Sequence, residues 1–234
     1  MPKDVIIALD FSTANETLEF LSPFQSLHPY VKIGMELYYA AGPEVVRQLK
    51  GAGYKVFLDL KLHDIPNTVR KAMKVLAGLG VDICNLHAAG TSAMMRAALE
   101  GLTEGCHGGR RPLLLAVTQL TSTSEEVMHQ ELLIPQSMGE TVAHYARNAH
   151  DAGLDGVVCS PLESRWVKDA CGSDFLTVTP GIRFADSPTD DQSRITTPAR
   201  AREIGTDYIV VGRPITQAPD PLAAYQRCMS EFVL

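Results

Sequence analysis

Eight short apolar runs, separated by longer amphipathic stretches, follow one another along the whole chain. The runs are rich in Val, Ile and Leu, and most of them do not alternate with polar residues. This pattern is typical of strands buried on both faces, as in a parallel sheet covered by helices. The expected strands are residues 5–10, 31–34, 56–61, 82–87, 113–118, 156–160, 176–179 and 208–212.

The stretches between the runs carry apolar residues at helical spacing. Pro66 stands in the first turn of one of them, where proline is favoured, and Thr13 is a candidate N-cap for the first. The expected helices are residues 14–24, 42–49, 66–79, 91–102, 138–152, 162–170, 198–204 and 219–232. Four glycines are expected to end helices in a left-handed conformation: Gly78, Gly80, Gly153 and Gly205.

Strands and helices that alternate in this way predict a fold class. Strand–helix units in tandem form parallel sheets through right-handed crossovers, and eight such units close a barrel. The sequence therefore predicts an α/β protein, a (β/α)8 TIM barrel formed by a single domain over residues 1–234. An open, doubly wound sheet is the alternative, although no Gly-x-Gly-x-x-Gly follows the first run. The longest polar loops, 121–136 and 183–194, are candidate lids.

Composition argues against some partners and indicates a location. The net charge of -6 argues against a nucleic-acid binder or a membrane-surface binder, since both need a basic face. The N-terminal apolar run is too short for a signal peptide or a membrane span. Five scattered cysteines without C-x-x-C spacing fit reduced thiols in the cytoplasm; they are Cys84, Cys106, Cys159, Cys171 and Cys228. We therefore expect a cytoplasmic protein.

Polar residues stand where the expected strands end. In strand order they are Asp10, Lys32, Asp59 with Lys61, His87, Thr118, Ser160, Thr179 and Gly212 with Arg213. In a barrel these positions converge on the face formed by the carboxyl ends of the strands. Active sites of such barrels lie on that face, so these residues are the first candidates for function.

Asp59 and Lys61 are the strongest candidates for chemistry. Because they are two residues apart, both side chains should point to the same side of their strand, and charges inside a barrel are costly unless they are paired. Lys32 can add a second positive charge from the neighbouring strand, and Asp64 a second negative charge from the turn that follows. Such a row keeps lysines protonated and carboxylates ionised, which places a proton donor beside a negative charge.

Simpler interpretations of these residues stay open. Asp-x-Lys-x-x-Asp on a surface helix is usually a solvated salt bridge, and Lys32 can extend its ammonium group to solvent. His87 can be a hydrogen-bonded core histidine. No set of histidines, cysteines or carboxylates has metal-ligand spacing, so the sequence predicts no metal.

The stretches after the seventh and eighth strands share a glycine and an arginine. Residues 177–183 read TVTPGIR, and residues 211–216 read VGRPIT. In phosphate-binding barrels the loops after these two strands hold the anion. Glycine lets the backbone approach the anion closely, and arginine adds charge-assisted hydrogen bonds. We therefore expect a phosphate site at Arg183 and Arg213, unless both stretches are ordinary strand-to-helix turns.

Several segments resemble the orotidine 5′-phosphate decarboxylase family of the bacterial, single-function type. The most specific is FLDLKLHDIPNTV at residues 57–69, and the match runs essentially from end to end. The others are ALD at 8–10, KIGMEL at 32–37, NLHAAG at 85–90, VTQLTS at 117–122, VTPGIR at 178–183 and VVGR at 210–213. The resemblance implies conversion of orotidine 5′-phosphate to uridine 5′-phosphate (UMP) and CO2, the last step of de novo UMP synthesis. It also implies no metal or organic cofactor, and homodimers with sites at the subunit interface.

The resemblance further implies roles in the reaction. Lys61 would protonate C6 of the pyrimidine as the carboxylate departs, and Asp59 would lie next to that carboxylate. Lys32 and Asp64 would complete the charged row, with Asp64 supplied by the partner subunit.

Contacts to the rest of the substrate are implied as well. Asp10, Lys32 and the partner subunit's Thr68 resemble ribose-hydroxyl contacts. Thr121 resembles the hydroxyl residue that reads the pyrimidine amide. The implied phosphate end consists of Pro180, Arg183, Gln192, Gly212 and Arg213.

Three other functions remain as alternatives. Lyases of the same barrel superfamily that act on sugar phosphates share Asp-x-Lys-x-x-Asp but use Mg2+, so a chelator would reveal them. An aldolase with Lys61 as Schiff-base nucleophile would be trapped by borohydride, although flanking carboxylates should keep that lysine too protonated. A non-catalytic regulator would bind UMP and turn nothing over.

Overall fold

The structure is a computed structural model that describes residues 3–106, 108–186 and 196–234. Within these residues, eight parallel strands form a closed barrel in the order of the sequence. They are β1 Asp4–Leu9, β2 Tyr30–Ile33, β3 Val56–Leu62, β4 Ile83–His87, β5 Leu113–Val117, β6 Gly156–Val158, β7 Leu176–Thr179 and β8 Tyr208–Val211. Because β1 pairs with both β2 and β8, the predicted TIM barrel is confirmed and the open sheet is excluded.

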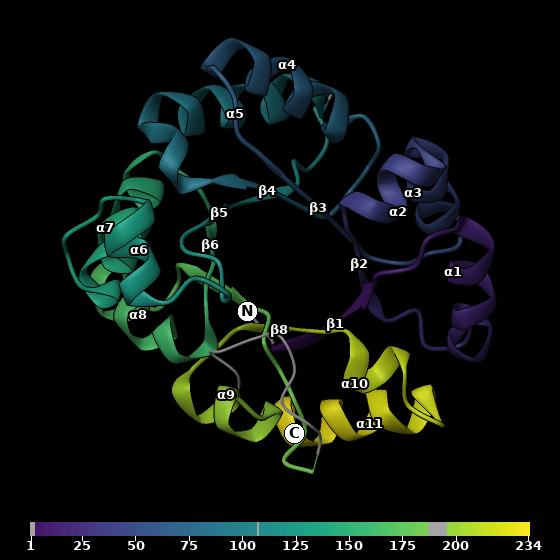
Figure 1. Ribbon diagram of the computed structural model, residues 1–234. Coiled ribbons are helices and arrows are strands. Elements are labelled where there is room, and N and C mark those ends of the chain that lie inside the picture. Colours follow the sequence, from purple (N-terminus) through teal and green to yellow (C-terminus); the bar gives the residue numbers. More distant parts are fainter. Residues whose placement is uncertain (1–2, 107, 187–195) are drawn as a thin grey trace.

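A ring of helices surrounds the strands (Figure 1). The α-helices are α1 Ala14–Leu21, α2 Met35–Ala41, α3 Pro43–Gly51, α4 Pro66–Ala77, α5 Thr91–Gly105, α6 Glu125–Glu131, α7 Met138–Asp151, α8 Ser164–Cys171, α9 Pro198–Ile204, α10 Arg213–Thr216 and α11 Pro221–Phe232. Short 3-10 segments are η1 Ser22–Phe24, η2 Ala88–Gly90 and η3 Pro161–Glu163. Local sequence sets several boundaries: Thr13 caps α1 in a capping box with Glu16, and Pro66 opens α4. No helix in the described part of the chain is both long and apolar enough to cross a membrane.

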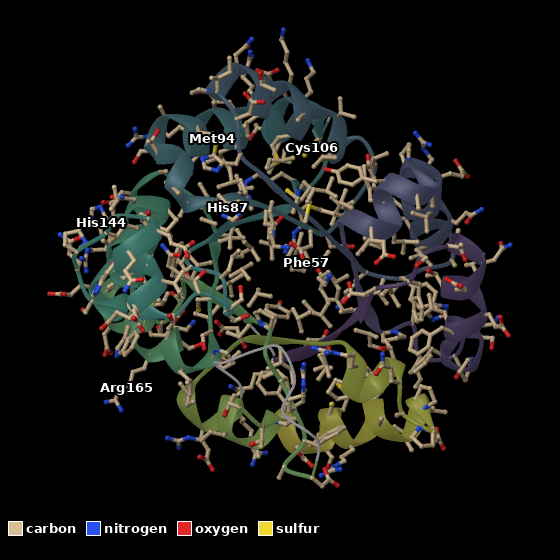
Figure 2. All side chains as sticks on the ribbon, in the orientation of Figure 1. Phe57, His87, Met94, Cys106, His144 and Arg165 are labelled. Atoms are coloured by element: carbon tan, nitrogen blue, oxygen red, sulfur yellow. The ribbon has the colours of Figure 1, made fainter. Side chains whose placement is uncertain are left out.

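The barrel has an inner and an outer core, because successive strand residues face opposite sides. The inner cluster consists of Ile6, Ala8, Tyr30, Phe57, Ile83, Leu115, Leu176, Val178, Tyr208 and Val210. The larger outer cluster lies between strands and helices and includes Leu58 and Leu60. Figure 2 shows Phe57 inside the ring of strands and Arg165 at the outer edge of the molecule. Since Phe57 faces inward, Asp59 two residues later does so too.

Some local expectations were wrong. The 121–136 stretch, expected as a loop, contains α6, which Ser124 caps by accepting from the Val127 backbone N–H. The first helix gives way to η1 at Ser22. The helix α2 was not expected, because Leu37 is its one residue buried in the core and no apolar periodicity marks it.

The glycine that ends α4 also differs from the expectation. Gly78 stays right-handed, with φ of -65°. The chain turns there through hydrogen bonds from Leu79 N to Leu76 O and from Gly80 N to Ala77 O, and Gly80 then supplies the left-handed residue. Gly80, Gly153 and Gly205 have φ of 73°, 88° and 98°, as predicted.

Candidate active site

A cavity of about 360 Å³ opens at the carboxyl ends of the strands. Side chains from seven of the strands or the loops after them line it, which is the convergence that the barrel topology predicts. The predicted site residues in its lining are Asp10, Lys32, Asp59, Lys61, Thr121, Pro180, Arg183, Gly212 and Arg213. Gln192 lies outside the described residues.

Four charged side chains form an alternating row along this cavity. The Lys32 Nζ lies 3.0 Å from Asp10 Oδ1 and 3.4 Å from Asp59 Oδ2. The Lys61 Nζ lies 2.7 Å from Asp59 Oδ1. Lys32 and Asp59 are buried, whereas the Asp10 side chain is largely exposed and Lys61 is partly exposed. Two lysines and two aspartates therefore alternate within one chain, in the order Asp10, Lys32, Asp59, Lys61.

Asp64 does not belong to the row of its own chain, so the position that residue spacing gave it is wrong. It is exposed, and its Oδ1 accepts a hydrogen bond from Ile65 N at 2.6 Å. The chain turns outward after β3 to begin α4 at Pro66, and Thr68 in the first turn of α4 is exposed as well. Neither residue lines the cavity formed by the described residues. A role for both across a subunit interface stays a prediction.

The charges of Asp59 and Lys32 reinforce one another. Burial alone would raise the pKa of Asp59, but the nearby ammonium groups of Lys32 and Lys61 and hydrogen bonds from Lys61 and Asn85 outweigh it, and the pKa is lowered. Burial alone would lower the pKa of Lys32, but Asp59 and Asp10 outweigh it, and the pKa is raised. Asp59 is therefore held ionised and Lys32 protonated.

Asn85 is a site residue that the sequence patterns did not single out. It lies in β4, is 1% exposed, and donates from Nδ2 to Asp59 Oδ1 at 2.7 Å. Its Oδ1 accepts from Lys61 N at 2.9 Å. A polar amide within the otherwise apolar run ICNL was the available signal, because a buried amide needs partners.

The β3 strand is irregular at the site. Leu58 pairs with Cys84, but Leu62 pairs with Leu86, so the register between β3 and β4 shifts across the stretch that holds Asp59 and Lys61. Lys61 has φ of 51°, a left-handed conformation that is uncommon for a residue with a side chain. Such an irregularity re-aims side chains and is frequent beside active sites.

The expected phosphate end lies beside the same cavity. Arg183 is buried and Arg213 begins α10, directly after Gly212. The chain is pinned next to Arg183, since Arg183 N donates to Thr196 O at 2.9 Å and Thr196 N donates to Gly181 O at 3.0 Å. Two arginines from separate loops therefore line one cavity.

Thr121 and His87 occupy different surroundings. Thr121 follows β5 in the cavity lining. His87 is half-buried outside that lining, and its ring lies 5.6 Å from the ring of His63. Burial first, and then the charges of His63 and Lys61, lower the pKa of His87. Among the described residues, no three His, Cys, Asp or Glu side chains are grouped so as to hold a metal ion.

Comparison with known proteins identifies the family. A family model described as the orotidine 5′-phosphate decarboxylase / HUMPS family matches residues 3–228. An orotidine 5′-phosphate decarboxylase from Bacillus caldolyticus is 57% identical over 228 residues, covering 97% of this chain and 93% of that protein. The chain belongs to the orotidine 5′-phosphate decarboxylase family. It is therefore an enzyme of the carboxy-lyase class.

Further relatives agree in sequence and in structure. An orotidine 5′-phosphate decarboxylase from Bacillus cytotoxicus is 56% identical over 233 residues, covering 99% of this chain and 98% of that protein. The crystal structure of orotidine 5′-phosphate decarboxylase from Lactobacillus acidophilus superposes with a TM-score of 0.87 at 45% identity, covering 99% of this chain and 100% of that one. A crystal structure described as an uncharacterized conserved protein from Geobacillus kaustophilus gives 0.88 at 51% identity, covering 97% of this chain and 99% of that one. The family resemblance in the sequence is thus confirmed.

Proposed function

We propose that the protein converts orotidine 5′-phosphate to UMP and CO2 in de novo pyrimidine biosynthesis, with the reaction in the carboxyl-end cavity. One observation carries the proposal: the pair of Asp59 and Lys61, 2.7 Å apart, lines the same cavity as Arg183 and Arg213. A nucleotide that carries a phosphate and a carboxylate needs an anion site and a proton donor within one cavity. Relatives more than half identical over nearly the whole chain carry this enzyme's name.

The reaction needs stabilisation of negative charge at C6. When the bond from C6 to the carboxylate breaks, the electron pair stays on C6 and CO2 leaves. The ring offers that pair no obvious electron sink, so the barrier reduction belongs in the upper part of the range of about 8–23 kcal/mol that enzymes achieve. The Lys61 ammonium group, fixed by Asp59 before the reaction, stabilises the developing charge and then gives its proton to C6.

The ionised Asp59 has two functions in this mechanism. It holds the ammonium groups of Lys61 and Lys32 in place. It also lies next to the substrate carboxylate, and the repulsion between them is relieved as CO2 departs.

The remaining contacts follow the same assignment. The phosphate binds at Arg183 and Arg213 with the backbone N–H of Gly212, Pro180 lies beside it in the cavity lining, and Gln192 completes this end. Binding energy at the phosphate, far from C6, keeps the ring in position during the reaction. Asp10 and Lys32 contact the ribose hydroxyls, and Thr121 reads the pyrimidine amide; these residues share the cavity lining.

We further propose that the enzyme is a homodimer in which Asp64 and Thr68 complete the partner's site. Both residues are exposed and lie outside their own chain's cavity. Ile65 between them is 67% exposed, an apolar side chain that an interface would cover. A location in the cytoplasm agrees with the scattered cysteine thiols, none of which is in a disulfide among the described residues.

The activity is tested by the loss of orotidine 5′-phosphate absorbance after adding enzyme, with and without EDTA. The proposal expects the same rate in both. Turnover of a ketose phosphate that EDTA abolishes would assign the chain to a metal-dependent lyase. UMP binding without any turnover would assign it to a regulator.

The shared site is tested by mixing two inactive variants, Lys61→Ala and Asp64→Ala. In a mixed dimer, one site receives Lys61 from one subunit and Asp64 from the other, so it is intact. Random reassociation should restore about a quarter of wild-type activity, because about half of the dimers are mixed and half of their sites are complete. No recovery after verified subunit exchange would show that each site comes from one chain.

A further inference from the structure

Asn85, on the neighbouring strand β4, makes hydrogen bonds to both Asp59 and Lys61. Its side-chain oxygen accepts from the Lys61 backbone N–H at 2.9 Å, and its side-chain nitrogen donates to Asp59 Oδ1 at 2.7 Å. The orientation of the amide follows from chemistry, because a backbone N–H can only donate and an ionised carboxylate can only accept. Both ends of one buried amide are therefore committed to the site.

The contact with Lys61 stabilises an unfavourable backbone. Where the β3–β4 register shifts between Leu58 and Leu62, the Lys61 N–H donates to the Asn85 side chain. Lys61 also has φ of 51°, a conformation that persists only where the surroundings hold it. The Asn85 oxygen is such a restraint, and it acts on the residue that carries the proton donor.

The contact with Asp59 fixes the other half of the pair. Asp59 Oδ1 accepts from both Lys61 Nζ and Asn85 Nδ2, each at 2.7 Å, while Oδ2 faces Lys32. A carboxylate with donors on both oxygens cannot rotate without losing a hydrogen bond. Asn85 thus limits the movement of the carboxylate that orients the Lys61 ammonium group.

We infer that Asn85 is a positioning residue for decarboxylation: it holds the left-handed Lys61 backbone and the Asp59 carboxylate in the geometry in which Lys61 reaches C6. The inference rests on the roles proposed for Asp59 and Lys61. In this role Asn85 does not contact the substrate. Its loss should therefore lower kcat and leave the phosphate-dependent KM and UMP affinity nearly unchanged.

Two substitutions distinguish a role of the Asn85 hydrogen bonds from a role of the side chain in packing alone. Asn85→Leu keeps the number and branching of the side-chain heavy atoms and removes both hydrogen bonds. Asn85→Asp keeps an oxygen for the Lys61 N–H but places a second carboxyl group against Asp59. Two carboxylates at that distance do not both ionise near neutral pH. When the new carboxyl group is protonated it can donate to Asp59 as the amide does, and when it is ionised it repels Asp59.

The charged and titratable groups near position 85 come from β2, β3 and β4 and from the turn after β3. Asp59 and Lys61 face it from β3, and Lys32 from β2 lies behind Asp59. His87 is two residues later on β4, near His63. The residue paired with Asn85 on β5 is Leu115, and β5 carries no titratable side chain. All these groups are present in the wild type and in both variants. The pH dependence of the ratio of Asn85→Asp kcat to wild-type kcat therefore reports the ionisation of the new carboxyl group.

The experiment measures kcat, KM and UMP affinity from about pH 5 to about pH 8.5. We expect kcat of Asn85→Leu to be about 100-fold below wild type at every pH, the scale of a displacement of about 1 Å at a reacting group. For Asn85→Asp, the ratio to wild-type kcat should rise at least about tenfold as the pH falls and the new carboxyl group becomes protonated. Thermal unfolding and UMP binding verify that each variant is folded.

Two results would overturn the inference. One is a kcat for Asn85→Leu within about twofold of wild type. The other is an Asn85→Asp ratio that stays constant across the pH at which the new carboxyl group is seen to titrate by NMR, which would show that the donor to Asp59 has no effect on turnover. This measurement decides the matter even if Asn85→Leu fails to fold. If Lys61→Ala is inactive while Asn85→Leu is normal, the inference alone fails. If Lys61→Ala is fully active, the proposed function fails with it.

Discussion

The two ends of the barrel both hold ion pairs, but the groups that these pairs contact differ. At the amino end, Asp82, Asp155 and Asp207 each lie one residue before the start of a strand. Each carboxylate pairs with a cation and also accepts a backbone N–H at the beginning of the preceding strand. At the carboxyl end, Asp10 and Asp59 pair with lysine side chains that line a cavity.

The difference suggests that the amino-end ion pairs contribute to the stability of the barrel and the carboxyl-end ion pairs contribute to its chemistry. Asp207 illustrates the amino end: it accepts from Thr177 N at 2.8 Å and from Lys168 Nζ at 2.6 Å, which ties the start of β7 to β8 and α8. Lys61 illustrates the carboxyl end, since its ammonium group faces the cavity and is held by a side chain. Removal of an amino-end charge should therefore affect unfolding, and removal of a carboxyl-end charge should affect turnover.

The largest effect is expected at Lys61. Lys61→Ala should retain the fold and lower kcat by about 10⁴-fold or more, because it removes both the proton donor and its electrostatic stabilisation. The matched control is Lys55→Ala, since Lys55 lies at the amino end beside Asp4 and Tyr30 and should keep wild-type turnover. Steady-state kinetics on folded protein measure both. A wild-type kcat for Lys61→Ala would contradict the role of the carboxyl-end row.

The next effect concerns stability. Asp207→Ala should lower the free energy of unfolding by about 3 kcal/mol, because it removes the carboxylate that pairs with the Lys168 ammonium group and leaves the Thr177 N–H without its acceptor. Its kcat should be unchanged where the protein is folded. Asp169→Ala is the control, since its pair with Arg165 is 4.0 Å long and exposed, and it should change stability by less than about 1 kcal/mol. Urea unfolding measures the free energy of unfolding of both variants. Equal values for Asp207→Ala and Asp169→Ala would contradict the stabilising role of the amino-end ion pairs.

A moderate effect is expected at the phosphate end. Arg213→Ala should raise KM and weaken UMP binding by about 10–100-fold, the loss of a charge-assisted contact, with a smaller change in kcat. Arg165→Ala on the exposed face of α8 is the control with the same change of charge. Calorimetric titration with UMP measures the affinities. Unchanged KM and UMP affinity in Arg213→Ala would place the phosphate elsewhere.

The smallest effect is the pH dependence of stability at Asp59. Because the folded state lowers the pKa of Asp59, its charge stabilises the protein above the unfolded pKa of about 3.9, and this contribution is lost as the pH falls through the lower folded pKa. The difference in unfolding free energy between wild type and Asp59→Asn should be constant from about pH 5 to about pH 8 and shrink below about pH 4. A difference that is independent of pH down to about pH 3 would contradict the charge assignment.

Much of the fold and of the carboxyl-end site could be predicted from the sequence. The short apolar runs placed every strand within two residues of its observed bounds, because a strand buried on both faces leaves a continuous signal. The spacing of two between Asp59 and Lys61 placed both side chains at the cavity. The family resemblance agrees with the comparisons.

Long-range partners set the limit of that prediction. The backbone N–H of the left-handed Lys61 donates to the Asn85 side chain, 24 residues away, and no local pattern encodes such a pair. Asp64 follows the strand too closely in sequence to be distinguished from a residue of the row, and the turn into α4 decides its place. The short helix α6 has Met128 as its one residue buried in the core, so it lacks the apolar periodicity that reveals longer helices.

A crystal structure with UMP bound would show at which end of the barrel the nucleotide binds. We expect pyrimidine C6 about 3–3.5 Å from the Lys61 ammonium nitrogen, the phosphate against Arg183 and Arg213, and no nucleotide at the amino end. A nucleotide bound at the amino end, or a carboxyl-end complex with C6 turned away from Lys61, would contradict this expectation.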